Sequence, residues 1–163
     1  MWFYQSHPSN KKDAIVLMLN PGSLSGSGDK IKTDTTLRIL REIFQNTGYN
    51  PYILNLFDLS TPKPKDLFSR WTDRDSSSDL FKYADLSRFS CVMYAYGNYE
   101  RTSIHRDDIK QRILEWRQHL QSISTLNLKT NASGTPMHPM SIQIRKLKPL
   151  FREQIAKGPI KRT

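Results

Sequence analysis

Cysteine and long apolar runs are almost absent from this sequence. Cys91 is the single cysteine in 163 residues, so no disulfide can form within the chain, and a reducing, cytoplasmic location is expected. No apolar run reaches membrane-spanning length, and the first residues lack the basic and long apolar regions of a signal peptide. We therefore expect no membrane partner.

Motifs for metals and for phosphate loops are also missing. The four histidines show neither His-x-x-His nor His-Glu-x-x-His spacing, which predicts no metal site. The glycine- and serine-rich stretch 23–28 lacks the Gly-Lys-Ser/Thr of a phosphate-binding loop and the Gly-x-Gly-x-x-Gly of a dinucleotide site. It also lacks the preceding strand that a serine-hydrolase motif requires. We expect no metal and no organic cofactor.

Acidic residues are few compared with basic ones. Lys and Arg number 25 against 15 Asp and Glu, which gives a net charge of +10 at pH 7. A well-solvated basic surface is one interpretation, and a polyanionic partner is the sharper one. We expect that partner to be DNA. The sequence leaves the oligomeric state open, with a monomer favoured.

Short apolar runs alternate with amphipathic segments along the chain. Strands are predicted at 15–19, 52–57, 90–96 and 123–128. Helices are predicted from Asp34 to Gly48 and at 79–86, 102–121 and 141–148, with a long polar loop at 60–78. Buried strands that alternate with helices form parallel sheets with right-handed crossovers. We predict one domain over 1–163, an α/β/α sandwich of three layers around a mostly parallel four-stranded sheet.

Polar residues stand where these apolar strands end. Asn20 follows the first strand, Asn55 interrupts the second, and His138 lies between Pro136 and Pro139. Ligands of open α/β sheets bind beyond the carboxyl ends of the strands. We therefore expect Asn20, Asn55 and His138 to share one pocket. Each also has a purely structural interpretation. Asn20 could belong to a turn that ends the strand, Asn55 could pair with a neighbouring loop, and His138 could be an ordinary surface histidine.

Five short motifs occur in a fixed order. They are Leu19-Asn20-Pro21-Gly22, Asp34-Thr35-Thr36-Leu37-Arg38, Asn55-Leu56-Phe57, Tyr96-Gly97 and Gly134-Thr135-Pro136-Met137-His138-Pro139. Together they resemble a bacterial and phage family of unknown function. That family is in turn similar to the uracil-DNA glycosylase superfamily, whose mismatch-specific members carry Asn-Pro-Gly after the first strand. Met18 replaces the first glycine of their Gly-Ile-Asn-Pro-Gly motif, and Asn20 offers an amide rather than an aspartate as a general base.

The resemblance implies a DNA glycosylase that flips an aberrant or modified base out of the duplex and breaks its N-glycosidic bond. His138 would donate a hydrogen bond to the departing base, and Asn20 would hold the attacking water. The resemblance places the base among Asn55, Phe57, Pro21 and Gly22. DNA contacts are expected from Lys63, Lys65, Arg70, Met140, Arg145, Lys146 and Lys148. Met140 or Ile142 would fill the gap that the flipped base leaves in the duplex. DNA repair or phage defence would be the setting.

Two other functions stay open. One is a catalytically silent module that binds nucleic acid or nucleotides, and the other is a hydrolase of free nucleosides or nucleotides. Product formation disfavours the silent module. Strongly salt-dependent binding to duplex DNA disfavours the nucleoside hydrolase, because release of counterions from phosphates produces that dependence.

Overall fold

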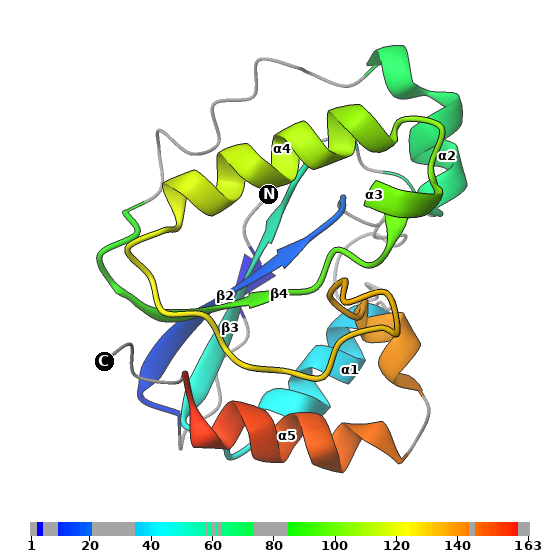
Figure 1. Ribbon diagram of the computed structural model, residues 1–163. Coiled ribbons are helices and arrows are strands. Elements are labelled where there is room, and N and C mark those ends of the chain that lie inside the picture. The colour runs from blue at the N-terminus through cyan, green and yellow to red at the C-terminus, as the bar shows by residue number, and fades with distance from the viewer. Residues whose placement is uncertain are drawn as a thin grey trace, which may run out of the picture.

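A central sheet organises the chain in the computed structural model, which describes residues 3–4, 10–20, 35–57, 59, 61, 63–73, 85–143 and 146–159. The sheet has the order β1-β3-β2-β4. Its three parallel strands are β2 Lys12–Met18, β3 Tyr49–Asn55 and β4 Phe89–Tyr94. The two-residue strand β1 Phe3–Tyr4 pairs antiparallel with β3. Figure 1 shows the three parallel arrows pointing the same way.

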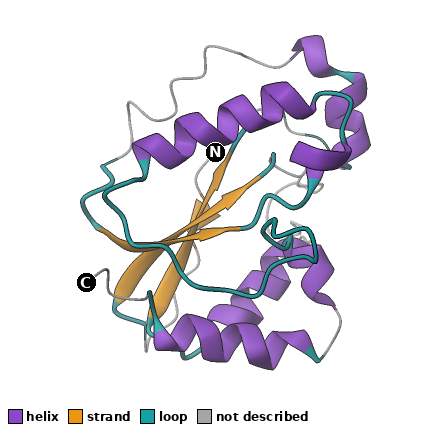
Figure 2. Cartoon of the chain, in the orientation of Figure 1, coloured by secondary structure: helices purple, strands orange, loops and turns teal. Residues whose placement is uncertain are grey.

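Helices cover both faces of this sheet (Figure 2). The helices are α1 Thr35–Phe44, α2 Pro64–Ser69, α3 Tyr99–Thr102, α4 Arg106–His119 and α5 Leu147–Lys157, with 3-10 turns η2 Trp71–Asp73 and η3 Pro139–Gln143. α4 lies across one face, and α1 and α5 lie together on the other.

The central strand β2 explains why the sheet is buried on both sides. Ala14, Val16 and Met18 pack toward α1 and α5, whereas Ile15 and Leu17 pack toward α4. Successive side chains of a strand point to opposite faces, so a strand covered by helices on both faces has an unbroken apolar sequence. The covering helices contribute Ile39, Leu40, Ile43 and Phe44 from α1, Phe151 and Ile155 from α5, and Ile109, Ile113 and Trp116 from α4.

The predicted α/β class with a parallel sheet is confirmed, but the predicted fourth parallel strand at 123–128 is wrong. That segment runs beside β4 and shares a single bridge with it, between Val92 and Thr125. Leu126 is buried in the core between the sheet and the α1–α5 pair, and Leu128 packs against that core. Ile123 belongs instead to the core on the α4 side, so the segment lies along the outer edge of β4 and contributes to both cores.

Three predicted boundaries also need correction. The loop predicted at 60–78 contains α2 and η2, because Pro64 suits the first turn of a helix and Leu67 is buried. The helix predicted at 102–121 is broken into α3 and α4 at Ser103, whose hydroxyl accepts a hydrogen bond from the His105 amide at 3.0 Å. The last helix spans 147–157 rather than 141–148.

Part of the prediction falls outside the described residues. This applies to Asp34 and to residues 79–84 of the predicted helix at 79–86, while residues 85 and 86 are not helical. Within the described ranges, no helix is long and apolar enough to cross a membrane.

Candidate functional site at the carboxyl ends of the strands

The carboxyl ends of β2, β3 and β4 meet at one edge of the sheet, on the side of α2 and α3 in Figure 1. Met18 is in register with Asn55, and the Ala95 amide donates to the Leu17 carbonyl at 2.8 Å. Met18, Ile53 and Ala95 all belong to the core on the α1–α5 side. By the alternation of strand residues, Asn55 also points to that side.

Asn55 is buried, with 4% of its surface exposed. Within the described part of the chain, its side-chain amide makes no hydrogen bond. Neither polar atom of this side chain is both fully buried and without a partner, so the Asn55 amide does not carry the full cost of an unpaired buried group. The structural interpretation of Asn55 is an amide paired with a neighbouring loop. Among the described residues, no loop makes such a pair.

His138 is held close to the end of β4. Gly97 follows that strand with φ +84°, and a Cβ added to Gly97 would lie 3.6 Å from the Cβ of His138. The Met140 amide donates a hydrogen bond to His138 Nδ1 at 3.1 Å. In a neutral imidazole the proton is then on Nε2, because one ring nitrogen donates when the other accepts. His138 is thus set up as a hydrogen-bond donor through Nε2.

A polar network fixes the loop that leads to His138. Asn98 Oδ1 accepts hydrogen bonds from Ser133 Oγ at 3.2 Å and from Thr135 Oγ1 at 3.0 Å. Asn131 Nδ2 donates to Thr135 Oγ1 and to the Pro136 carbonyl, each at 3.0 Å. The sequence prediction missed Asn98, although it comes soon after the end of a strand, as Asn20 does, and this was a usable signal.

Asn20 joins the end of β2 to the segment that follows β3. Its Nδ2 donates to the Leu59 carbonyl at 3.3 Å and to Thr61 Oγ1 at 2.8 Å. Thr61 is itself buried. Both protons of the amide are therefore committed within the fold, and only the amide oxygen has the chemistry to orient a water in the predicted way.

Phe57 does not lie on the same side as Asn55. It belongs to the core between the sheet and α4, where its ring meets Trp71 edge-on at a centroid distance of 5.1 Å. The predicted stacking of Phe57 on a base is therefore replaced by a packing contact in this structure. The physical reason is that the strand alternation stops after Leu56, because Leu56 and Phe57 both belong to the core on the α4 side.

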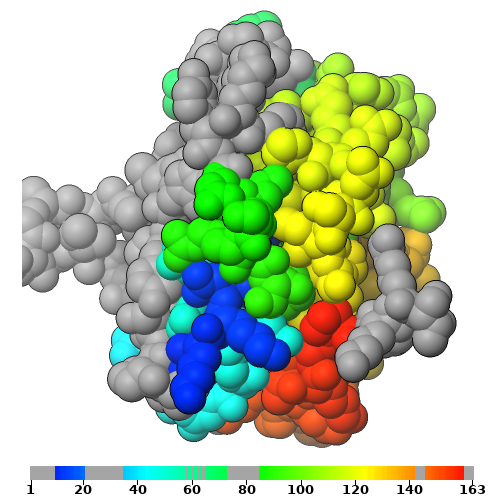
Figure 3. Space-filling model, turned by 90° about the vertical axis from the view of Figure 1, so that its left-hand side faces the viewer, coloured from blue at the N-terminus to red at the C-terminus, as the bar shows by residue number. Residues whose placement is uncertain are grey.

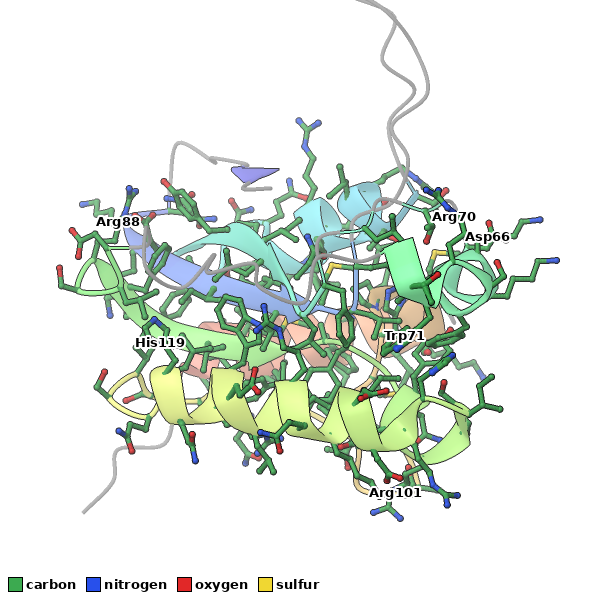
Figure 4. All side chains as sticks on the ribbon, turned by 90° about the horizontal axis from the view of Figure 1, so that it is seen from above. Asp66, Arg70, Trp71, Arg88, Arg101 and His119 are labelled. Carbon is green, nitrogen blue, oxygen red and sulfur yellow. The ribbon has the colours of Figure 1, made fainter. Side chains whose placement is uncertain are left out.

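An aromatic cluster beside this edge was also missed. The His105 ring stacks on Trp71, with centroids 4.3 Å apart and an interplanar angle of 9°, and Phe68 packs against both rings and Tyr99. Figure 4 shows Trp71 between α2 and α4. No sequence signal links Trp71 to His105, because only the docking of η2 on the start of α4 brings them together.

The predicted DNA-contacting residues differ in their surroundings. Lys63, Lys65, Arg70 and Lys146 are exposed, and Met140 is 41% exposed next to His138. Lys148 is instead ion-paired with Glu42, and its hydrogen bond lowers the pKa of that carboxyl. Pro21, Gly22 and Arg145 lie outside the described residues, as does the side chain of Ile142.

The comparison with protein families identifies the family of this chain. A family described as a protein of unknown function, DUF1643, matches residues 2–140. Searches of curated proteins and of solved structures found no match. Among the described residues, no group of three or more His, Cys, Asp or Glu side chains is arranged to hold a metal ion.

Proposed function

The chain belongs to the DUF1643 family of proteins of unknown function, and we propose that it is a DNA glycosylase acting on an aberrant or modified base. The finer fold assignment, a three-layer sandwich like that of uracil-DNA glycosylases, is part of the proposal. Helices on both faces of a parallel sheet support it. So does the gathering of polar residues at the carboxyl edge, where open α/β sheets bind ligands.

The fixed ring of His138 is the observation that supports this function best. The bond between the deoxyribose C1′ and the base nitrogen breaks, and its electron pair leaves with the base. Negative charge then develops on the base, and a preorganised Nε2–H donor stabilises it. Water adds its oxygen to C1′, and its proton ends on the released base. No metal or organic cofactor is required by these steps.

The two asparagines take separate parts in the proposal. Asn55 pairs with the edge of the flipped base through its amide, which can both donate and accept. The amide oxygen of Asn20 accepts a hydrogen bond from the attacking water, while its Nδ2 stays bound to Leu59 and Thr61. Exposed Lys63, Lys65, Arg70 and Lys146 contact phosphates, and Met140 fills the gap in the duplex.

The test is incubation of the protein with duplexes that each carry one uracil, mismatched thymine, deaminated purine or alkylated base. Free base and abasic sites are measured under single-turnover conditions. With the preferred duplex, His138→Ala should slow base release by about a hundred- to a thousandfold, the usual cost of one preorganised donor. His119→Ala is the matched control, because His119 lies on α4, away from the carboxyl edge, and should leave the rate unchanged.

The outcomes separate the three candidate functions. Release of base from duplex DNA that depends on His138 supports the glycosylase. Salt-dependent duplex binding without release, across the whole panel, supports the silent module. Release of base from free nucleosides, but not from DNA, supports the nucleoside hydrolase. Full activity of His138→Ala would rule out the role given to His138.

A further inference from the structure

A pocket of about 340 Å³ lies on the outer side of β4 and reaches the loop before His138. Its walls come from the end of α4, the extended segment 123–130, α5 and the loop before His138. Asn20, Asn55 and His138 are not among the described residues that line it. Figure 3 shows the chain after α4 (yellow) between the start of β4 (green) and the end of α5 (red). The volume suits a small organic molecule.

One cation of this pocket is held in place by two aromatic residues. Arg117 Nη2 donates a hydrogen bond to the hydroxyl of Tyr96 at 2.9 Å. The Arg117 guanidinium also lies over the Tyr94 ring, 4.6 Å from its centroid. Tyr96 is 1% exposed, so its hydroxyl is a rigid anchor. A guanidinium has five N–H donors, and a positioned one recognises phosphate or carboxylate oxygens at little entropic cost.

The charge and surface of the described lining indicate an anion with a partly apolar body. Arg117 and Lys129 line the pocket, and no Asp or Glu is among the described residues that line it. Leu126 and Phe151 are buried core residues that form its apolar wall. Asn127 adds an amide that can both donate to and accept from a heterocycle. Two cations match a phosphomonoester, which carries about −1.5 to −2 charge at pH 7.

We propose that this pocket binds a phosphorylated heterocyclic molecule of nucleoside-monophosphate size. The phosphate is held by Arg117 and Lys129, and the heterocycle lies against Leu126 and Phe151 with its polar edge at Asn127. This site is separate from the proposed glycosylase site, and it does not depend on that activity. Pro136 and Met137 line the pocket next to His138, so a bound ligand rests against the loop that carries this histidine.

The test is calorimetric titration of the full chain with the four common nucleoside 5′-monophosphates, with uncharged nucleosides and inorganic phosphate as separate arms. We expect at least one monophosphate to bind more tightly than both its nucleoside and phosphate. Arg117→Gln should weaken that binding by about ten- to a hundredfold, because a charge-assisted hydrogen bond is lost. Lys110→Gln removes a charge from the same helix outside the pocket and should leave the affinity unchanged.

Amide chemical-shift mapping locates the bound monophosphate. Shifts at Thr125, Asn127 and Met137, absent in Arg117→Gln, support the site. Equal affinity in Arg117→Gln and the natural chain would overturn it. Inorganic phosphate that binds as tightly as every monophosphate would overturn the role of the apolar wall. An Arg117 dependence seen only with oligonucleotides, and with no monophosphate, would assign the pocket to a DNA strand instead.

Discussion

Buried asparagines at the two edges of the sheet differ in their hydrogen bonding. Asn10 and Asn50 at the amino edge and Asn55 at the carboxyl edge are all buried, with exposed fractions of 8%, 6% and 4%. The two amino-edge amides are paired within the fold. The amide of Asn55 has no hydrogen-bond partner among the described residues. Burial alone therefore does not distinguish a structural asparagine from a candidate ligand-binding one.

Asn10 shows how a structural amide is satisfied. Its Nδ2 donates to the Phe44 carbonyl at 3.1 Å and to the Tyr49 carbonyl at 2.6 Å. Its Oδ1 accepts from the Gly48 amide at 2.9 Å. These bonds close the turn between α1 and β3 against the start of β2. The side chain is fully used by the protein, so no part of it is left for a ligand.

The charged residues of the amino edge are paired in the same manner. Arg88 donates to the Asp13 carboxylate at 2.8 Å and to the Tyr52 hydroxyl at 2.5 Å. Figure 3 looks onto this edge, and Figure 4 shows Arg88 at the opposite end from Arg70 and Trp71. The comparison shows that Asn10 and Arg88 at the amino edge are paired within the fold, whereas the amide of Asn55 at the carboxyl edge makes no hydrogen bond to a described residue.

The largest effect on stability is expected from Asn10→Ala. Three hydrogen bonds of about 1 kcal/mol each are lost, so the free energy of unfolding should fall by about 3 kcal/mol. The Phe44 carbonyl still accepts a hydrogen bond from the Thr47 hydroxyl in this variant. Urea denaturation measures this change. Duplex binding and base release should be unchanged at temperatures where the variant is folded. A loss below about 1 kcal/mol would show that the amino edge is not closed by this residue.

The next effect concerns Asn20, which has both a structural and a proposed catalytic part. Asn20→Ala should lower stability by about 1–2 kcal/mol, because two hydrogen bonds to Leu59 and Thr61 are lost. It should also slow base release without weakening duplex binding. Thr61→Val is the matched control, because it removes the shorter of these bonds and keeps the Asn20 oxygen. Equal slowing in both variants would show that Asn20 acts only by holding the segment that contains Leu59 and Thr61 in place.

A smaller change in stability is expected from pH, through the buried thiol of Cys91. Burial raises the pKa of the Cys91 thiol to about 12. The unfolded thiol has a pKa of about 8.5, so between these values the unfolded chain releases a proton that the folded chain keeps. Stability should therefore fall as pH rises through this window, by about 1 kcal/mol between pH 9 and pH 10. Cys91→Ala, measured alongside by denaturation, should lack this part of the slope. An identical slope would show that the thiol is not shielded.

The smallest change in stability is expected from Asn55→Leu. No hydrogen bond to a described residue is lost and an apolar side chain replaces the amide, so stability should change by less than about 1 kcal/mol or rise. Asn50→Leu, on the same strand at the other edge, should cost about 1–3 kcal/mol because its amide is bonded to Asn10 and Asp13. Thermal or urea unfolding compares the two variants. Similar losses in both would remove the contrast between the edges.

The function test for the same residue uses Asn55→Asp. This change replaces the amide donor by an acceptor, so the set of bases released should change while the fold remains. Single-turnover rates across the duplex panel measure it. An unchanged base preference would show that Asn55 does not read the base.

The sequence determined those features that local pattern encodes. The apolar run through Ile15 and Leu17 predicted a strand buried on both faces, and the spacing of Ile109, Ile113 and Trp116 predicted the buried stripe of α4. Polar residues after such strands located the candidate edge, because parallel strands end together. These predictions succeeded because periodicity and strand direction depend on near neighbours in the chain.

Only the tertiary structure decided how those polar residues are used. Whether a buried asparagine is satisfied depends on carbonyls more than thirty residues away for Asn10, and on the network around Asn98 for the His138 loop. The His105 stack on Trp71 and the pocket at Arg117 likewise arise where distant segments dock. Hydrogen bonds and packing act over a few ångströms in space, whatever the separation in sequence, so no local pattern could predict them.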